Sequence, residues 1–153
     1  MAGGGLSIAL ACDFSYAELG AKFVFAFVNI GFIPDMGSSL MLQRNVGAAK
    51  AKELMLLGNR FTGEEAARWG IITGAVEAAD LEETVKKTAV KLAAGPSLAY
   101  ERCKRLLNRG LYQGLEDAME NEGEYQYQLC KTADHAEAVR AFFEKRRPEF
   151  KGI

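Results

Sequence analysis

The sequence predicts a mixed α/β (α+β) fold in which two short strands near the start of the chain precede a series of helices. Aromatic and β-branched residues gather in residues 14–17 and 22–25, which predicts the strands. Helical periodicity and helix-ending glycines prevail from residue 37 onward. Two strands cannot form a stable sheet alone. Either they join a sheet supplied by sequence outside this chain, or the chain holds a different number of strands.

Composition bounds the class of protein. The chain has 153 residues, of which 49% are hydrophobic and 25% charged, as in an ordinary globular domain with a core. A net charge of -1 gives no reason to expect nucleic acid or an acidic membrane surface as a partner. The three cysteines are widely spaced and form no CxxC pair, which argues against a disulfide framework or a zinc site. We therefore expect no metal, no membrane span, and a cytoplasmic location, with an organelle matrix left open.

The first helix follows a run of three glycines. Residues 6–11 are apolar and small, which predicts a buried helix that ends at Asp13. Between the two predicted strands, Gly20 favours a turn. The free N–H groups at the start of such a helix would point back at the glycines.

Glycines and capping residues divide the middle of the chain. Helices are predicted over residues 37–44 and 48–57, separated by Gly47, and Gly58 is a plausible terminator. Thr62 and Glu65 have the spacing of a capping box, which predicts a short helix ending at Gly70.

The second half reads as helices throughout. Asp80 repeats the capping spacing before a helix whose apolar face is Leu81, Val85, Ala89 and Leu92. The next helix, over residues 96–109, ends at Gly110 and is expected to turn inward Leu98, Cys103, Leu106 and Leu107. A helix over residues 115–130 follows. Thr132 caps a last helix with the apolar residues Ala136, Val139, Phe142 and Phe143.

Two features can carry chemistry, and each has a simpler structural interpretation. A glycine N–H at a helix N-terminus can approach a ligand oxygen closely and stabilise negative charge, but three glycines also suit a tight turn. Asp35 lies among Phe32, Ile33 and Met36, where apolar neighbours would raise its pKa and suit it to proton transfer. An Asp before Gly37 and two serines is also a preferred helix N-cap.

Other polar residues give weaker signals. His135 is the only histidine and is expected to be solvated in the first turn of its helix. Glu120, Glu122 and Glu124 are typical of a solvated face rather than a metal site. The basic residues 145–147 suit phosphates, or equally the cation-rich end of a helix.

Several motifs in order resemble one family. Residues 2–13 resemble the GGG-x-x-LALACD signature of the enoyl-CoA hydratase/isomerase (crotonase) superfamily. Residues 31–37, GFIPDMG, are similar to its L-G-x-x-P-x-x-G turn, and the end of the chain is similar to its A-F-x-E-K-R-x-P-x-F motif. Further segments match in the same order along the whole chain: residues 21–23, 42–47, 53–58 and 66–72.

The resemblance implies a fold and a chemistry. The fold would be an incomplete crotonase spiral of ββα units over residues 1–75, followed by a helical trimerisation region over residues 76–153. The family stabilises the enolate of an acyl-CoA thioester between two backbone N–H groups. Gly4 would supply the second of these, and the first would come from an upstream loop outside this chain. Coenzyme A would arrive as part of the acyl-CoA substrate rather than as a bound cofactor, and a homo-oligomer, a trimer or a dimer of trimers, is expected.

Departures from the family pattern point to a subgroup. Ser7 and Phe27 stand where hydratases of the family have their two glutamates, so conventional hydration is disfavoured. Asp35 falls where several isomerases place a single acidic residue. Residues 26–35 look similar to the isomerases of phenylacetate degradation, which act on ring-derived acyl-CoA. The resemblance therefore implies an acyl-CoA double-bond isomerase in fatty-acid or aromatic-acid degradation, with Asp35 as the proton shuttle.

The remaining site residues follow from the same resemblance. Gly3 and Gly5 would flank the substrate beside Gly4. Phe27, Ile33 and Met36 would line an apolar acyl pocket, and Val24, Phe25 and Ala26 would share that wall. Phe150 and Lys151 would touch CoA, either of this subunit or of a neighbour.

Two alternatives stay open. The first is another reaction on the same fold, by an atypical hydratase, lyase or dehalogenase. The second belongs to a different class: a truncated fragment that lacks catalysis and retains only self-association through its helices.

Overall fold

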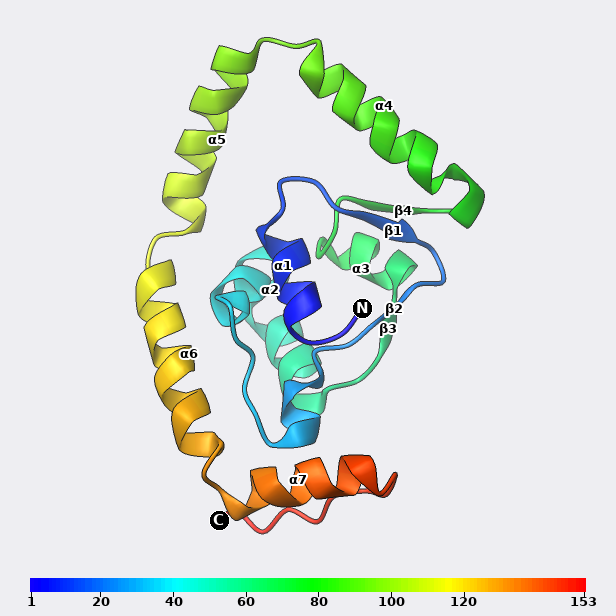
Figure 1. The fold of residues 1–153 in the computed structure, drawn as a ribbon. Helices are drawn as coiled ribbons and strands as arrows, with labels where there is room; N and C mark the ends of the chain where they lie inside the picture. The colour runs from blue at the N-terminus through cyan, green and yellow to red at the C-terminus, as the bar shows by residue number, and fades with distance from the viewer.

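A computed structural model describes residues 1–153, and Figure 1 shows their arrangement. The elements in chain order are α1 (Gly4–Ala11), β1 (Tyr16–Glu18), β2 (Lys22–Phe23), η1 (Ala26–Ile30), α2 (Ser38–Leu57), β3 (Phe61–Thr62), α3 (Gly63–Trp69), β4 (Gly74–Val76), η2 (Ala78–Asp80), α4 (Leu81–Ala93), α5 (Ser97–Leu111), α6 (Leu115–Leu129) and α7 (Ala133–Phe143). Helices dominate, with short strands in the first half, so the predicted mixed class is confirmed.

The strands form two small sheets within the chain. β1 pairs in parallel with β4, with Tyr16 opposite Gly74. β2 pairs antiparallel with β3, with Lys22 opposite Thr62. The predicted number of two strands was wrong, because β3 and β4 are too short to show a two-residue period in the sequence. The strands are also shorter than predicted: β2 ends at Phe23, and η1 begins at Ala26.

A single hydrophobic core lies between α1, α2, η1, α3 and the strands. Leu6 of α1, Leu42 of α2 and Phe25 are fully buried in it. The ring of Phe25 stacks on Phe61 with centroids 6.2 Å apart. Phe25 therefore faces the core, and its place in the wall of an acyl pocket stays a prediction.

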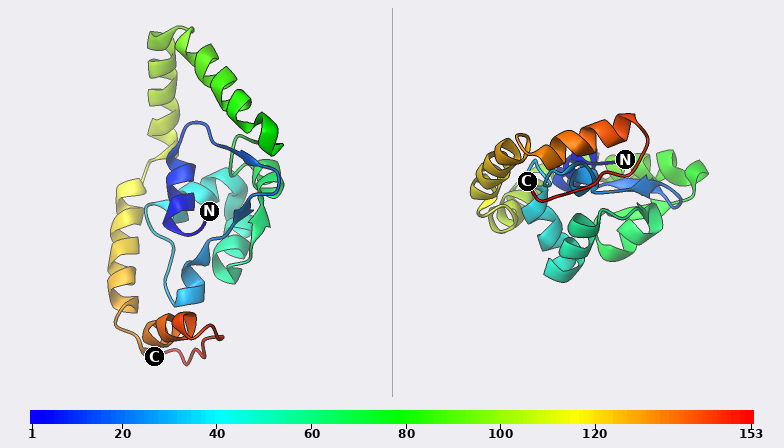
Figure 2. Two further views of the ribbon diagram at one scale, coloured as in Figure 1. Left: turned by 45° about the vertical axis from the view of Figure 1, so that its right-hand side comes forward. Right: turned by 90° about the horizontal axis from the view of Figure 1, so that it is seen from below.

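Helices α4 to α7 extend around this core. Figures 1 and 2 show α4 and α5 meeting at a point away from the core, α6 running along one side and α7 crossing one end. The face of α5 that was predicted to turn inward is open, with Leu98 and Leu106 each 74% exposed. In α7 the apolar residues Ala136, Val139, Phe142 and Phe143 are also exposed, and the buried side chains are Ala138 and Ala141. None of the helices combines the length and apolar character needed to span a membrane.

Some of the predicted helix ends are present in the structure and others are not. Gly47 interrupts α2 with φ 78° and ψ 163°, and Gly58 ends it in the left-handed region, as predicted. The capping box of Thr62 and Glu65 is present. The predicted cap at Asp80 was wrong: Asp80 has helical backbone angles at the end of η2, so its side chain caps nothing. Gly110 likewise does not end α5, which continues to Leu111.

Candidate active site

The glycine run forms the turn into α1. Gly3 is the N-cap residue, with φ 53° and ψ −131°, angles that a residue with a side chain rarely adopts. Its carbonyl accepts the N–H of Leu6 at 2.9 Å, while its own N–H donates to Val24 at 3.1 Å. Gly4 is the first residue of α1, so its N–H has no acceptor within the helix. The predicted loop and helix are both present, with the helix starting two residues earlier than expected.

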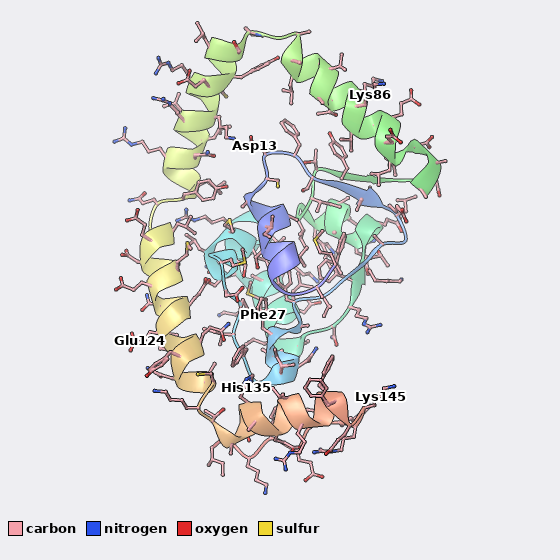
Figure 3. All side chains as sticks on the ribbon, viewed as in Figure 1. Asp13, Phe27, Lys86, Glu124, His135 and Lys145 are labelled. Carbon is pink, nitrogen blue, oxygen red and sulfur yellow. The ribbon has the colours of Figure 1, made fainter.

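The turn after η1 comes up against these glycines. A Cβ placed on Gly4 would lie 3.3 Å from Sδ of Met36 and 4.0 Å from Oδ1 of Asp35. A Cβ on Gly3 would lie 3.8 Å from Cζ of Phe27, which Figure 3 places on η1 beside the start of α1. The structure thus brings together five of the residues singled out from the sequence.

Two other predicted site residues, Gly5 and Ile33, lie at the edge of this group. A Cβ on Gly5 would meet Met1 at 3.2 Å, on a different side of α1 from Asp35. Ile33 is partly buried at the start of the turn, and its carbonyl oxygen accepts the side-chain amide of Gln126 at 2.8 Å.

Asp35 is not a helix cap. The N-cap of α2 is Gly37, and both the N–H and the hydroxyl of Ser38 donate to the backbone carbonyl of Asp35, not to its carboxylate. Oδ1 of Asp35 is buried and has no hydrogen-bond partner. Burial raises the pKa of this carboxyl, the negative charge of Glu122 raises it further, and a backbone hydrogen bond opposes both. A raised pKa makes the carboxylate a better proton acceptor, which suits Asp35 to proton transfer.

The turn itself has an unusual backbone. Met36 has φ 57° and Gly37 has φ 74°. A left-handed conformation costs a residue with a side chain roughly 1–2 kcal/mol, so surrounding contacts must hold Met36 in place. Such strain concentrates at functional sites.

Those contacts come from α6. Glu122 is only 5% exposed, and it accepts the N–H of Gly37 at 2.7 Å and the N–H of Ser39 at 3.1 Å. The hydroxyl of Ser39 donates to it as well. The prediction that Glu122 is solvated was therefore wrong. A signal was present, because on a helix Glu120 and Glu124 share one face while Glu122 points to the other.

His135 was also misjudged as a solvated side chain. Its Nδ1 lies 2.7 Å from the carbonyl oxygen of Ile30, so this nitrogen carries the proton and donates it. Its ring stacks on Phe32 with centroids 3.9 Å apart and an angle of 12°. The side chain joins α7 to η1 and to the loop that leads to Asp35 (Figure 3).

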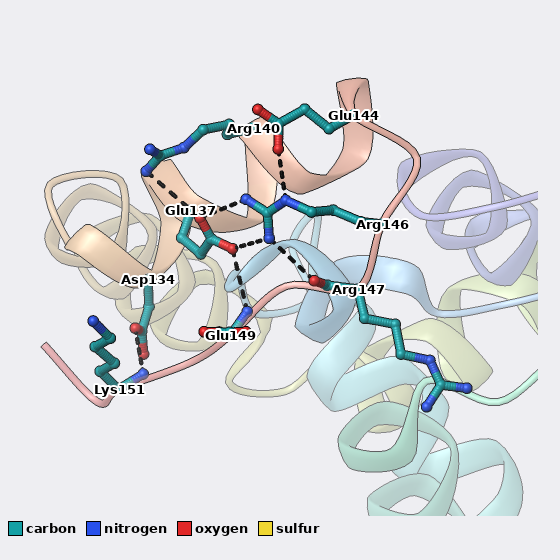
Figure 4. Close-up of polar contacts among 8 residues, drawn as sticks. All are labelled: Asp134, Glu137, Arg140, Glu144, Arg146, Arg147, Glu149 and Lys151. Atoms are coloured by element: carbon teal, nitrogen blue, oxygen red, sulfur yellow. Dashed lines mark hydrogen bonds and ion pairs between the residues drawn. The ribbon is translucent and has the colours of Figure 1, made fainter.

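The C-terminal tail folds back along α7 (Figure 4). The N–H groups of Lys151 and Gly152 donate to the two carboxylate oxygens of Asp134, each at 2.7 Å. Phe150 is half exposed and lines a pocket of about 360 Å³ together with Val28 and others. The structure thus places Phe150 beside Val28 of η1 and Lys151 against Asp134 of α7.

Of the basic residues of the tail, Arg146 is already paired. It binds Glu137 at 2.5 Å and Glu144 at 2.6 Å (Figure 4). Hydrogen bonds from Arg146 lower the pKa of Glu137 to about 2. Arg146 therefore anchors the tail to α7, which makes it a poor candidate for phosphate binding.

A cavity of about 690 Å³ lies elsewhere. It is bounded by the end of α1 and by α4 and α5, and its polar lining includes the ion pair between Asp13 and Lys104. None of the residues around Asp35 lines it. No three His, Cys, Asp or Glu side chains lie close enough together to hold a metal ion.

Comparison with known proteins places the chain in a family. The profile of the family described as "Enoyl-CoA hydratase/isomerase" matches residues 1–153. A probable enoyl-CoA hydratase of Rhodobacter capsulatus is 40% identical over 99% of this chain and 59% of its own length. The 1,2-epoxyphenylacetyl-CoA isomerase of Escherichia coli is 38% identical over 99% of this chain and 58% of its own length.

Solved structures of the same family are similar to this chain. An enoyl-CoA hydratase of Mycobacterium avium subsp. paratuberculosis superimposes with a TM-score of 0.94 at 37% identity, over 98% of this chain and 61% of that one. The chain therefore spans about three fifths of the length of the relatives it matches. The relatives include both hydratases and isomerases, so their names do not choose between the two reactions. The chain belongs to the enoyl-CoA hydratase/isomerase family.

Proposed function

We propose that the protein that carries this chain is an acyl-CoA double-bond isomerase. The observation that carries the proposal is the free Oδ1 of Asp35, which is buried, has no hydrogen-bond partner and faces Gly4 at the start of α1. A proton acceptor and a backbone donor at a helix N-terminus are the two groups that enolate chemistry requires.

The reaction divides between these two groups. The N–H of Gly4 donates to the thioester oxygen, and a second N–H, which the family resemblance places outside these residues, completes the pair. Asp35 takes a proton from one carbon of the acyl chain, and the electron pair of that C–H bond moves into the enolate. The protonated Asp35 then returns the proton to another carbon, which shifts the double bond. One carboxylate suffices because it is regenerated in each cycle.

Two buried residues support isomerisation over hydration. Ser7 is 1% exposed and its hydroxyl has no hydrogen-bond partner. Phe27 is also buried and cannot ionise. At the positions where the resemblance expects the two glutamates of hydratases, neither residue can activate water.

The apolar surroundings favour a hydrophobic acyl group. Ile33 and Met36 lie within two residues of Asp35 in the sequence, while Phe27 lies against Gly3 and Met36 against Gly4. We propose that these three residues line the acyl pocket, with Gly3 and Gly5 beside the thioester. We propose a role in fatty-acid or aromatic-acid degradation, and the similarity to the 1,2-epoxyphenylacetyl-CoA isomerase of E. coli supports an aromatic acyl group. Phe150 and Lys151 remain proposed CoA contacts.

Self-association is the proposed role of the second half. We propose the division into a spiral core over residues 1–75 and an oligomerisation region over residues 76–153. The exposed apolar residues of α5 and α7, Leu98, Leu106, Leu107, Phe142 and Phe143, support it because such faces mark protein–protein contacts. A trimer or a dimer of trimers in the cytoplasm is the proposed assembly.

The decisive experiment replaces Asp35 with asparagine in the full protein. Conversion of 3-enoyl-CoA to 2-enoyl-CoA is followed by absorbance, and Asp35→Asn is expected to lower kcat about 100-fold or more, as the loss of a general acid/base does. The matched control is Asp80→Asn, the same chemical change at an exposed residue that caps nothing. Conversion at the wild-type rate in Asp35→Asn would show that this carboxylate is not the proton shuttle.

A calorimetric titration addresses the inert-fragment alternative. The 153-residue chain is titrated with an acyl-CoA, and micromolar binding is expected if the site around Gly4 and Asp35 holds the thioester. An absence of binding by this chain, together with activity in the full protein, would assign the missing contacts to residues outside it.

A further inference from the structure

Two side chains of α6, one helical turn apart, form hydrogen bonds with the backbone of the loop that carries Asp35. Gln126 donates to the carbonyl of Ile33 at 2.8 Å, before Asp35, and Glu122 accepts from Gly37 and Ser39, after it. These contacts join residues 83 to 93 positions apart in the sequence. They enclose the strained turn on both sides.

The carboxylate of Glu122 also caps the N-terminus of α2, which lacks a capping side chain of its own. The N-cap of this 20-residue helix is Gly37, which has no side chain, and its first turn contains no acidic residue. Free N–H groups at a helix N-terminus attract negative charge. Glu122 supplies that charge from α6, and its three donors satisfy a carboxylate that would otherwise be costly to bury.

The hydrogen bonds of Glu122 and Asp35 indicate different roles for the two carboxylates. The oxygens of Glu122 are occupied by backbone and hydroxyl donors, so they are not free to exchange protons with a substrate. Oδ1 of Asp35 has no partner. We propose that Glu122, assisted by Gln126, is a positioning residue that fixes the turn at Met36 and Gly37 so that Asp35 faces Gly4. This inference rests on the proposed isomerase function.

Glu122 also affects the pKa of Asp35, and a residue with a purely structural role would leave this pKa unchanged. After burial, the charge of Glu122 is the next cause of the raised pKa of Asp35. Glu122 is the one charged group among the causes of this pKa shift, and α1 and η1 contain no ionisable residue. In α2, the side chain of Arg44 is engaged with the carbonyls of Gly110 and Gln113. Removing the charge of Glu122 therefore lowers the pKa of Asp35.

The test compares Glu122→Gln with Glu120→Gln in the full protein. Both variants lose one negative charge from α6, but Glu120 is exposed; Figure 3 shows the neighbouring Glu124, which shares its face, pointing away from the core. Glu122→Gln is expected to lower kcat by roughly 10- to 100-fold, as a small misplacement of a catalytic group does, with KM within about twofold of the wild-type value. The acid limb of the pH profile of kcat/KM should move to lower pH. Glu120→Gln should change neither quantity.

Gln126→Ala covers the case in which Glu122→Gln does not fold. It removes only a neutral hydrogen bond, and a loss of kcat of roughly three- to tenfold at unchanged KM is expected. If the wild-type protein shows no isomerase activity, the proposed function and this inference both fail. If the wild type is active and the folded variants keep its kcat and its acid limb, the positioning role is refuted and the isomerase function stands.

Discussion

Replacing Gly37 with alanine should destabilise the protein by about 2–3 kcal/mol. The first contribution is the backbone, because φ is 74° at this position, and the left-handed region costs a non-glycine residue roughly 1–2 kcal/mol. The second is steric, because the new Cβ would lie 2.5 Å from Cδ1 of Leu115. That atom ends a flexible side chain, so it can move aside, at the lower end of the roughly 1–3 kcal/mol that overpacking costs.

Urea unfolding followed by circular dichroism measures this change, provided that the m-value stays constant. Gly123→Ala is the matched control, because Gly123 lies inside α6 and a Cβ there meets no atom within 4 Å. It should stabilise the protein by about 0.5–1 kcal/mol. The two glycine-to-alanine changes thus have opposite signs. A stability of Gly37→Ala equal to that of the wild type would refute the described turn.

Two further predictions concern the polar contacts at helix ends. Thr62→Ala removes the side chain that accepts the N–H of Glu65 at 3.1 Å and should cost about 1 kcal/mol in urea unfolding; a variant as stable as the wild type would count against the capping box. Glu137→Gln tests the tail contact: because the folded pKa is lowered to about 2, the carboxylate stabilises the fold above its unfolded pKa near 4.5, and this is lost as pH falls toward 2. Thermal unfolding should find the variant less stable at pH 6, by an amount that shrinks as the pH falls to 2, whereas a pH-independent difference would contradict the pairing with Arg146.

Features fixed by neighbouring residues were predicted well from the sequence. The capping box needs only Thr62 and Glu65, and the break at Gly47 needs only one glycine, so each is visible in a short window. Asp80 shows the limit of this reasoning, because the preceding η2 turn, which the spacing does not reveal, gives it helical angles.

Features that depend on distant residues were missed or misassigned. Glu122 was predicted to be solvated because its partners, Gly37 and Ser39, lie more than 80 positions away. The apolar face of α5 was predicted to be inward because a periodic pattern identifies a face without saying what covers it. The approach of Asp35 to Gly4 followed from the family motifs and not from any local signal, and the roles of both residues remain predictions.

The hydrogen bonds between α6 and the Asp35 turn affect the order in which the chain can fold during synthesis. The capping box of α3 closes over three residues, whereas the bond from Glu122 to Gly37 closes a loop of 85 residues, at an entropic cost of roughly 4 kcal/mol. Synthesis proceeds from the N-terminus, so Asp35 leaves the ribosome long before α6 exists. The Asp35 turn therefore gains its contacts with Glu122 only after α6 has been made, and a nascent chain stalled before residue 122 would carry every proposed catalytic group of this chain without these contacts.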